Sequence, residues 1–309
     1  MSSPPLLDLI ARRQPGICLY GFAPPKRSTS AEQLSQIASQ QVERLAALDL
    51  DGVIVYDIQD EAERTAAPRP FPFLPTISPE QYAHEHLAAL AHPKVVYRCV
   101  ASETQQSFIE WLERERAAPP ITVLVGAPSR NAAGGLGLKG AYGLVERHAP
   151  GMLLGGIAIA ERHSRGLDEH ERVLAKTAAG CSFFVTQAVY DVTSTLSLLS
   201  DYALALRARE QPAQPIILTF SPCGSLKTLE FMKWLGIGFP RWLENELRHS
   251  ADPLATSLAL CERMFLEVLE FARDKGIPLG VNVESVSIRK AEIEASIELV
   301  KTFRAKLRR

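Results

Sequence analysis

Eight short apolar segments, separated by stretches with helical periodicity, constrain the fold of this chain more than any other feature. Most of them are rich in β-branched or aromatic residues, which is typical of buried strands. They are the runs Ile17–Phe22, Val53–Asp57, Val95–Val100, Ile121–Gly126, Met152–Ala158, Ser182–Gln187, Pro215–Phe220 and Leu279–Val283. Regular alternation of strand and helix predicts a parallel sheet in which each strand is followed by a helix.

The segments between these strands have the spacing of amphipathic helices. Ala31–Leu48 carries apolar residues at three- to five-residue steps. Glu169–Ala179 opens with acidic residues and is followed by Gly180, and both features favour a helix with these ends. After the last strand, Arg289–Leu307 is another amphipathic candidate with a basic end.

These elements fill 309 residues, a length near the ~250 residues typical of a (β/α)8 barrel. We therefore predict an α/β fold, a single (β/α)8 TIM barrel over residues 1–309, with extra loop and helix insertions. An open doubly wound sheet is the alternative, although it usually has fewer strands. The insertions are the proline-rich loop Arg64–Pro79 and a pair of helices between Leu226 and Asn245. Each either covers the site or a partner, or wraps the surface.

Composition excludes several classes of partner. The chain has 34 basic and 35 acidic residues, so no excess charge attracts nucleic acid or anionic membranes. Its five cysteines are scattered, without the paired spacing of a zinc site, as expected of buried thiols in a reducing cytoplasm. No secretory signal opens the sequence, and no run approaches the roughly 20 apolar residues of a membrane span. We expect a cytoplasmic protein without a metal, nucleic-acid or membrane partner.

Polar side chains follow two successive strands in the middle of the chain. The apolar segment Gly155–Ala160 runs into Glu161 and His163, and the next strand ends in Gln187, with Asp191 four residues on. In a parallel sheet or barrel, ligands bind and chemistry occurs where the carboxyl ends of the strands meet. We expect these side chains to lie at a binding site.

Two carboxylates are candidate catalytic groups. Glu161 directly follows an apolar strand, so it must face a pocket or find partners, because burying an unpaired carboxylate is costly. Asp57 holds the equivalent place on the second strand. Either is a candidate general acid or base if its surroundings raise its pKa toward neutrality.

The helix after His163 carries charged residues on one face, because Glu169, Arg172 and Lys176 are spaced at i, i+3 and i+7. They form either a solvated charged face or a site in which Arg172 and Lys176 hold the phosphates or ribose of a nucleotide cofactor. His163 is either a contact to a ligand ring or phosphate, or an ordinary surface histidine.

The residue order of Gly155–Asp191 resembles the methylenetetrahydrofolate reductase family, whose segments read roughly A-Y-P-E-x-H and G-A-x-x-x-x-T-Q-x-x-x-D. Leu235–Leu243 is similar to the segment of that family that ends in (I/V)-P-x-W. The family folds as a (β/α)8 barrel. Its members pass a hydride from NAD(P)H, through FAD or in some branches directly, to methylenetetrahydrofolate, giving methyltetrahydrofolate.

The resemblance also implies cofactors and roles for individual residues. FAD and NAD(P)H are the cofactors that it suggests, and Gln187 matches a glutamine that contacts folate. The positions that match flavin contacts are His163, Glu169, Arg172 and Lys176.

Three positions depart from the pattern of that family. Gly21 stands where a glutamate serves as the acid that helps to open the folate imidazolidine ring. Ala127 replaces an aspartate that tunes the flavin, and Leu226 replaces an aromatic residue that stacks on folate. A positioned acid contributes roughly 10²–10⁴-fold to a rate, so a reductase of this kind needs a substitute. The candidates are Asp57, Glu61 and Glu161.

We predict a divergent methylenetetrahydrofolate reductase-like oxidoreductase of one-carbon metabolism, which transfers a hydride from NAD(P)H, with or without FAD, to a tetrahydrofolate-like substrate. One alternative is a folate-binding one-carbon transferase or demethylase without redox chemistry. Another is a non-catalytic subunit that uses Phe71–Leu74 or the region Trp234–Trp242 as a contact surface. The aromatic residues of that region are also compatible with a homo-oligomer.

Overall fold

The computed structural model describes residues 5–61, 67–127 and 135–308 of the chain. Its eight parallel strands form a closed barrel in the order β1 to β8, which confirms the predicted (β/α)8 fold and excludes the open sheet. The strands are β1 (Cys18–Phe22), β2 (Gly52–Val55), β3 (Lys94–Cys99), β4 (Ile121–Val125), β5 (Leu154–Ala158), β6 (Cys181–Ala188), β7 (Ile216–Phe220) and β8 (Leu279–Glu284).

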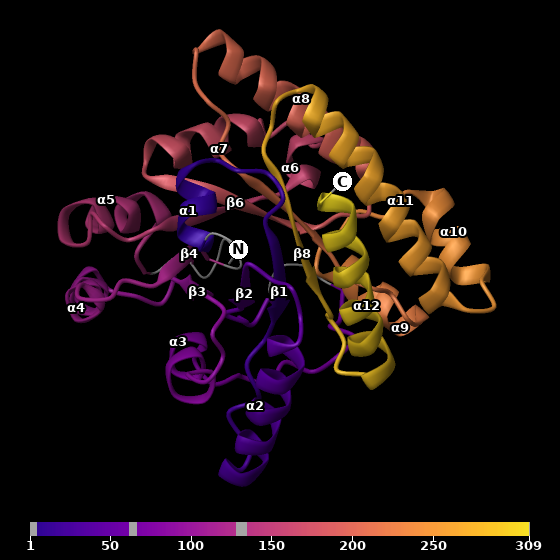
Figure 1. The fold of residues 1–309 in the computed structure, drawn as a ribbon, viewed down its shortest axis with the longest axis horizontal. Coiled ribbons are helices and arrows are strands. Elements are labelled where there is room, and N and C mark those ends of the chain that lie inside the picture. The colour runs from indigo at the N-terminus through magenta and orange to yellow at the C-terminus, as the bar shows by residue number, and fades with distance from the viewer. Residues whose placement is uncertain (1–4, 62–66, 128–134, 309) are drawn as a thin grey trace.

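Helices surround the strands, as Figure 1 shows. They are α1 (Leu6–Ala11), α2 (Ala31–Ala46), α3 (Pro79–Gln81), α4 (Gln105–Glu115), α5 (Leu138–His148), α6 (Ala160–His163), α7 (Glu169–Ala178), α8 (Val192–Ala208), α9 (Leu226–Trp234), α10 (Arg241–His249), α11 (Pro253–Asp274) and α12 (Lys290–Leu307), with a π-helical turn at Tyr82–His86. The helix pair predicted after residue 226 is α9 and α10. Residues 64–66 of the predicted proline-rich loop lie outside the described residues.

One predicted strand boundary is wrong at the end that matters for the site. β2 ends at Val55, and the amide of Tyr56 makes one more hydrogen bond, of 3.0 Å, to the carbonyl oxygen of Phe22, so Asp57 lies in the loop that follows and not in the strand. Apolar character continues through Tyr56, which is why the sequence pattern runs past the strand.

Alternate side chains of the strands fill the inside of the barrel. This interior group comprises Ile17, Leu19, Ile54, Val95, Tyr97, Ile121, Val123, Phe183, Val185 and Ile217, with Leu6 and Ile10 of α1. Because α1 contributes to this group, it closes the N-terminal end of the barrel. A Cβ at Gly155 would lie 2.4 Å from Cζ of Phe183, so only glycine leaves room for that ring. The opposite side chains of the strands pack against the helices.

Arg304, near the end of α12, ties the last helix to the start of the barrel. Its guanidinium donates to both carboxylate oxygens of Asp51, at 2.8 and 3.0 Å, and to the carbonyl oxygen of Gly16 at 3.0 Å. Asp51 also accepts a hydrogen bond from the amide of Cys18 at 2.8 Å. The side chain of Asp51 is only 3 % exposed, and a buried charge is tolerated only while its partner is present.

Replacing Arg304 with methionine should lower the free energy of unfolding by about 3 kcal/mol or more, because Asp51 then stays buried without its partner. Denaturation by urea, monitored by circular dichroism, measures the change. Lys301→Met is the control, since Lys301 pairs with Glu298 where both side chains are more than half exposed. Such a surface pair contributes at most about 1 kcal/mol. Equal losses in the two variants would contradict this account of α12.

None of the helices in the described part of the chain combines the length and the apolar character needed to cross a membrane.

Candidate active site

The C-terminal ends of the strands, here called the mouth, carry polar side chains that face into the barrel. Gly21 on β1 and Glu284 on β8 are register partners. Register partners on parallel strands project to the same face of a sheet, so Glu284 points toward the side on which a side chain at position 21 would lie. Glu284 is the last residue of its strand and is partly exposed.

Tyr56 occupies the space that glycine leaves at position 21. A Cβ on Gly21 would lie 2.7 Å from Cε2 and from Oη of Tyr56. The Tyr56 ring packs edge-on against Tyr97, with 4.9 Å between ring centroids. Its Oη accepts a hydrogen bond of 2.8 Å from Nδ2 of Asn282 and donates its own proton to Glu284. The carboxyl group that the first strand lacks is therefore present on the neighbouring strand.

Glu284 is a functional candidate that sequence reasoning missed. Loss of water on burial raises the pKa of Glu284 to about 7, against the opposing effect of the hydrogen bond from Tyr56. A carboxyl with a pKa near the working pH is suited to proton transfer. The available signal was its place directly after the apolar run Leu279–Val283, the same reasoning that selected Glu161 after its own strand.

Gln187 and Glu161 are brought together by the loop between α9 and α10. Nε2 of Gln187 donates to the carbonyl oxygen of Leu235 at 2.8 Å, and Oε1 of Glu161 accepts from the amide of Gly238 at 3.0 Å. Burial raises the pKa of Glu161, and the nearby charge of Asp191 adds to the shift. Oε1 of Gln187 is buried without a hydrogen-bond partner among the described residues, so it remains an available acceptor.

Asp57 lies elsewhere around the mouth. Its carboxylate accepts hydrogen bonds from the amide of Cys99 at 2.7 Å and from Nε2 of Gln59 at 2.6 Å, which ties the end of β2 to the end of β3. It also lines a cavity of about 390 Å³ with Tyr97 and Arg98. Asp57 follows β2 whereas Glu161 follows β5, so the two predicted catalytic carboxylates do not form a pair.

Glu169 and Lys176 are engaged inside the protein. Glu169 is fully buried, accepts a hydrogen bond from the amide of Ile159 at 3.1 Å, and lies 3.9 Å from a guanidinium nitrogen of Arg172. Nζ of Lys176 donates to the carbonyl oxygen of Ile157 at 2.5 Å, and burial lowers the pKa of Lys176. These contacts attach α7 to the end of β5.

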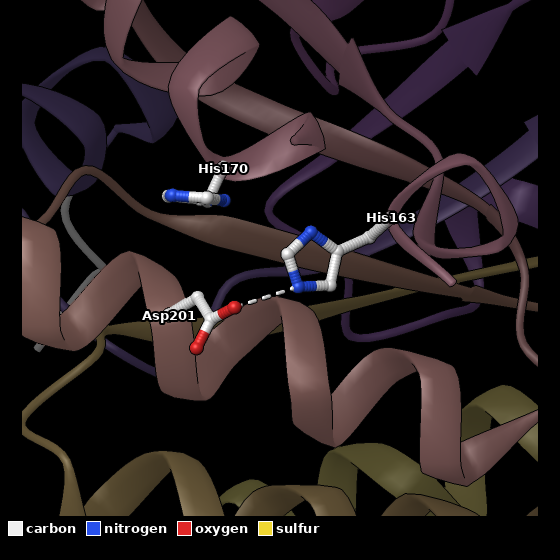
Figure 2. A group of neighbouring side chains, drawn as sticks. All are labelled: His163, His170 and Asp201. Atoms are coloured by element: carbon white, nitrogen blue, oxygen red, sulfur yellow. Dashed lines mark hydrogen bonds and ion pairs between the residues drawn. The ribbon is translucent and has the colours of Figure 1, made fainter. Parts of the chain in front are cut away.

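His163 belongs to a cluster between three helices. Figure 2 shows His163 from α6, His170 from α7 and Asp201 from α8 near one another, with Nε2 of His163 3.0 Å from Oδ2 of Asp201. One ligand atom from each residue lies within 4.8 Å of the others, so the three side chains could hold a divalent ion. The contact between His163 and Asp201 also serves to join α6 to α8.

The four side chains assigned to a flavin by resemblance therefore do not form an open site. Glu169 and Lys176 bind backbone groups at β5, His163 binds Asp201, and Arg172 lies half-exposed beside Glu169. This arrangement does not fit a flavin held by these residues, and flavin binding stays a prediction.

Comparisons with known proteins place the chain in a family. No family model matches, and no curated protein matches. Among solved structures, an uncharacterized protein from Clostridium thermocellum is 42 % identical, with a TM-score of 0.87, over 97 % of this chain and 99 % of that one. The chain belongs to the family of that protein. The Clostridium protein is described as binding two copies of 5-methyl-5,6,7,8-tetrahydrofolic acid.

Two other solved structures are far less similar to this chain than the Clostridium relative. A xylanase from Paenibacillus barcinonensis is 10 % identical with a TM-score of 0.49, covering 92 % of this chain and 87 % of its own. A putative deoxyribose-phosphate aldolase from Toxoplasma gondii ME49 is 8 % identical with a TM-score of 0.46, covering 95 % and 97 %. Neither bears on the function of the present family.

The two insertions contact each other near the mouth. Residues 67–75, here called the strap, leave the β2 side and reach α9 on the β7 side, so β1 and β8 lie between their points of attachment. Nε1 of Trp234 donates to the carbonyl oxygen of Ala67 at 3.0 Å. Phe71 packs edge-on against Phe231, with 5.2 Å between centroids. Phe71 and Trp234 of the predicted contact surface thus make contacts inside the molecule, whereas Trp242 is half-exposed, and a partner for this surface stays a prediction.

Arg69 stabilises the strap by cation–π contacts with three aromatic rings. Its guanidinium carbon lies 4.9 Å from the Trp234 ring centroid, 5.2 Å from that of Phe73 and 5.6 Å from that of Phe231. Its Nε and Nη1 are buried without hydrogen-bond partners among the described residues, while Nη1 lies 4.0 Å from a carboxylate oxygen of Asp60. Arg69 is therefore well placed to receive an anionic group.

Replacing Arg69 with alanine should loosen the strap, because its cation–π contacts, worth ~0.5–2 kcal/mol each, are lost. Hydrogen exchange of the amides in residues 67–75 should accelerate while global unfolding changes little. Arg263→Ala is the matched control, since Arg263 lies over Trp242, whose ring is half-exposed and remote in sequence from the strap. Unchanged exchange in the Arg69 variant would show that other contacts hold this segment.

Proposed function

We propose that this chain binds a reduced folate of the 5-methyltetrahydrofolate class at the mouth of its barrel and acts on it in one-carbon metabolism. The observation that carries the proposal is the 42 % identity, over nearly the full length of both chains, to a protein described as binding 5-methyltetrahydrofolic acid. Methyltetrahydrofolate is also the product of the reductase family that the sequence resembles.

The groups at the mouth match the chemistry of a reduced folate. Its pterin ring presents several N–H donors, and Oε1 of Gln187 is a buried acceptor without a partner among the described residues. Its benzoyl ring suits the aromatic side chains of the strap and α9. Its glutamate end carries carboxylates, and Nε and Nη1 of Arg69, which have no hydrogen-bond partner among the described residues, are donors that could bind them.

For the reaction, we propose hydride transfer from NAD(P)H to a one-carbon unit on the folate, as the resemblance implies. The loss of an acid at Gly21 does not remove acid–base chemistry, because Glu284 supplies a carboxyl on the adjacent strand. NADH or NADPH oxidation that depends on methylenetetrahydrofolate tests this reaction. Added FAD shows whether a flavin is required.

A folate-dependent transfer reaction without redox chemistry is the second candidate. It is favoured by one observation, namely that Glu169, Lys176 and His163, the residues that resemblance assigns to a flavin, already bind protein groups. Binding of 5-methyltetrahydrofolate without any folate-dependent oxidation of NADH or NADPH would favour this candidate.

Replacing Gln187 with methionine should weaken the binding of 5-methyltetrahydrofolate by about tenfold or more, since a ligand hydrogen bond to a buried group contributes roughly 1–3 kcal/mol. Isothermal titration calorimetry measures the affinity, and circular dichroism verifies folding. Gln40→Met is the control, because Gln40 is exposed on α2, away from the mouth. If the wild-type protein binds no reduced folate at all, the proposed function is wrong.

A further inference from the structure

Glu284 differs from the other carboxyl groups at the mouth in what it touches. Asp57 accepts hydrogen bonds from the Cys99 amide and from Gln59, and Glu161 accepts one from the Gly238 amide. Backbone amides thus hold the oxygens of Asp57 and Glu161 in contacts that join neighbouring segments. Glu284 instead receives a hydrogen bond from a phenol, that of Tyr56.

Three phenol groups interact electrostatically with Glu284. Tyr56 follows β2, Tyr97 lies on β3 and Tyr20 lies on β1. Burial raises the pKa of each of these phenols, and the charge of Glu284 adds to the shift. All three are therefore uncharged near pH 7. Asn282, two residues earlier on β8, holds Tyr56 in place through its Nδ2. In this environment the carboxyl group of Glu284 can be protonated, and so neutral, at physiological pH.

We propose that Glu284 is the proton donor of the folate site. This inference rests on the proposed function and names the group through which the site acts on its ligand. The neutral carboxyl of Glu284 donates a hydrogen bond to a basic nitrogen of the bound reduced folate and, in the reaction, gives that nitrogen its proton.

The proton-transfer step is balanced within the site. The O–H bond of Glu284 breaks, and its electron pair stays on the carboxylate. The lone pair of the folate nitrogen forms the new N–H bond, so the nitrogen becomes positively charged. Tyr56 continues to donate to the carboxylate and stabilises the negative charge. A protonated nitrogen is a better leaving group for the carbon attached to it, which serves both hydride transfer and one-carbon transfer.

The register of the barrel explains why position 284 can take this role. Gly21 and Glu284 are partners across the β1–β8 pairing, and Tyr56 covers Gly21. A side chain at position 21 would displace the Tyr56 ring that bonds to Glu284. Glycine at position 21 therefore makes room for the Tyr56 ring, and the Tyr56 hydroxyl in turn bonds to the carboxyl group on β8.

The pH dependence of 5-methyltetrahydrofolate binding tests this inference. If only the neutral form of Glu284 donates to the ligand, the affinity of the wild-type protein should fall about tenfold between pH 6 and pH 8, through a midpoint near 7. Glu284→Gln keeps a neutral donor of the same size, so it should bind with nearly constant affinity over this range. Calorimetry at several pH values measures both proteins.

Two further variants separate ionisation from folding. Tyr56→Phe removes the hydrogen bond that lowers the pKa of Glu284, so the midpoint should move above that of the wild type. Glu298→Gln changes an exposed glutamate on α12 and should leave the profile unchanged. Infrared spectra of the free protein report the protonated carboxyl directly, and its band should disappear near pH 7 in the wild type and be absent in Glu284→Gln.

The outcomes distinguish this inference from the proposed function. A wild-type affinity that stays constant, or that rises with pH, would overturn the role of Glu284 while leaving folate binding intact. The same conclusion would follow if Glu284→Gln retained the wild-type pH profile. Failure of the wild-type protein to bind 5-methyltetrahydrofolate at any pH would overturn the proposed function, and this inference with it.

Discussion

Closure of the barrel between β1 and β8 is the constraint on which the rest of the structure depends. Parallel pairing around a closed ring places every strand's carboxyl end at one mouth, and the register of the last pair sets Gly21 beside Glu284. The buried pair of Arg304 and Asp51 supports this closure from α12, and Asp51 in turn binds the Cys18 amide at the start of β1. Residues from the two ends of the chain thereby build one site.

The mouth is organised by contacts between segments that are distant in sequence. Gln187 and Glu161 bind the loop between α9 and α10, while the strap binds α9 through Trp234 and Arg69. The insertions after β2 and after β7 therefore contact each other, and the second also contacts Gln187 and Glu161. Tyr56 adds a further link, because its hydroxyl joins Asn282 to Glu284.

The proposed ligand is a reduced folate, and its chemistry can be compared with the contacts at the mouth. Of the side chains that resemblance assigns to a flavin, Glu169 and Lys176 bind backbone groups near the end of β5, and His163 binds Asp201. Among the described residues, Oε1 of Gln187 and two guanidinium nitrogens of Arg69 have no hydrogen-bond partner. Similarity to a protein described as binding 5-methyltetrahydrofolic acid agrees with that chemistry. The proposed acid on β8 agrees with a general property of such barrels, because different residues at the strand ends give the same fold different chemistries.

The sequence by itself determined the barrel, because eight apolar runs with helical stretches between them leave few other ways to bury their side chains. It also placed Glu161 and Gln187 at strand ends, since local pattern reveals where a strand stops. Only the tertiary structure decided that Glu284 stands beside Gly21, that Tyr56 fills the space above this glycine, and that the strap lies on α9. These contacts depend on strand register and long-range packing, and such pairings leave no periodic signal in the sequence.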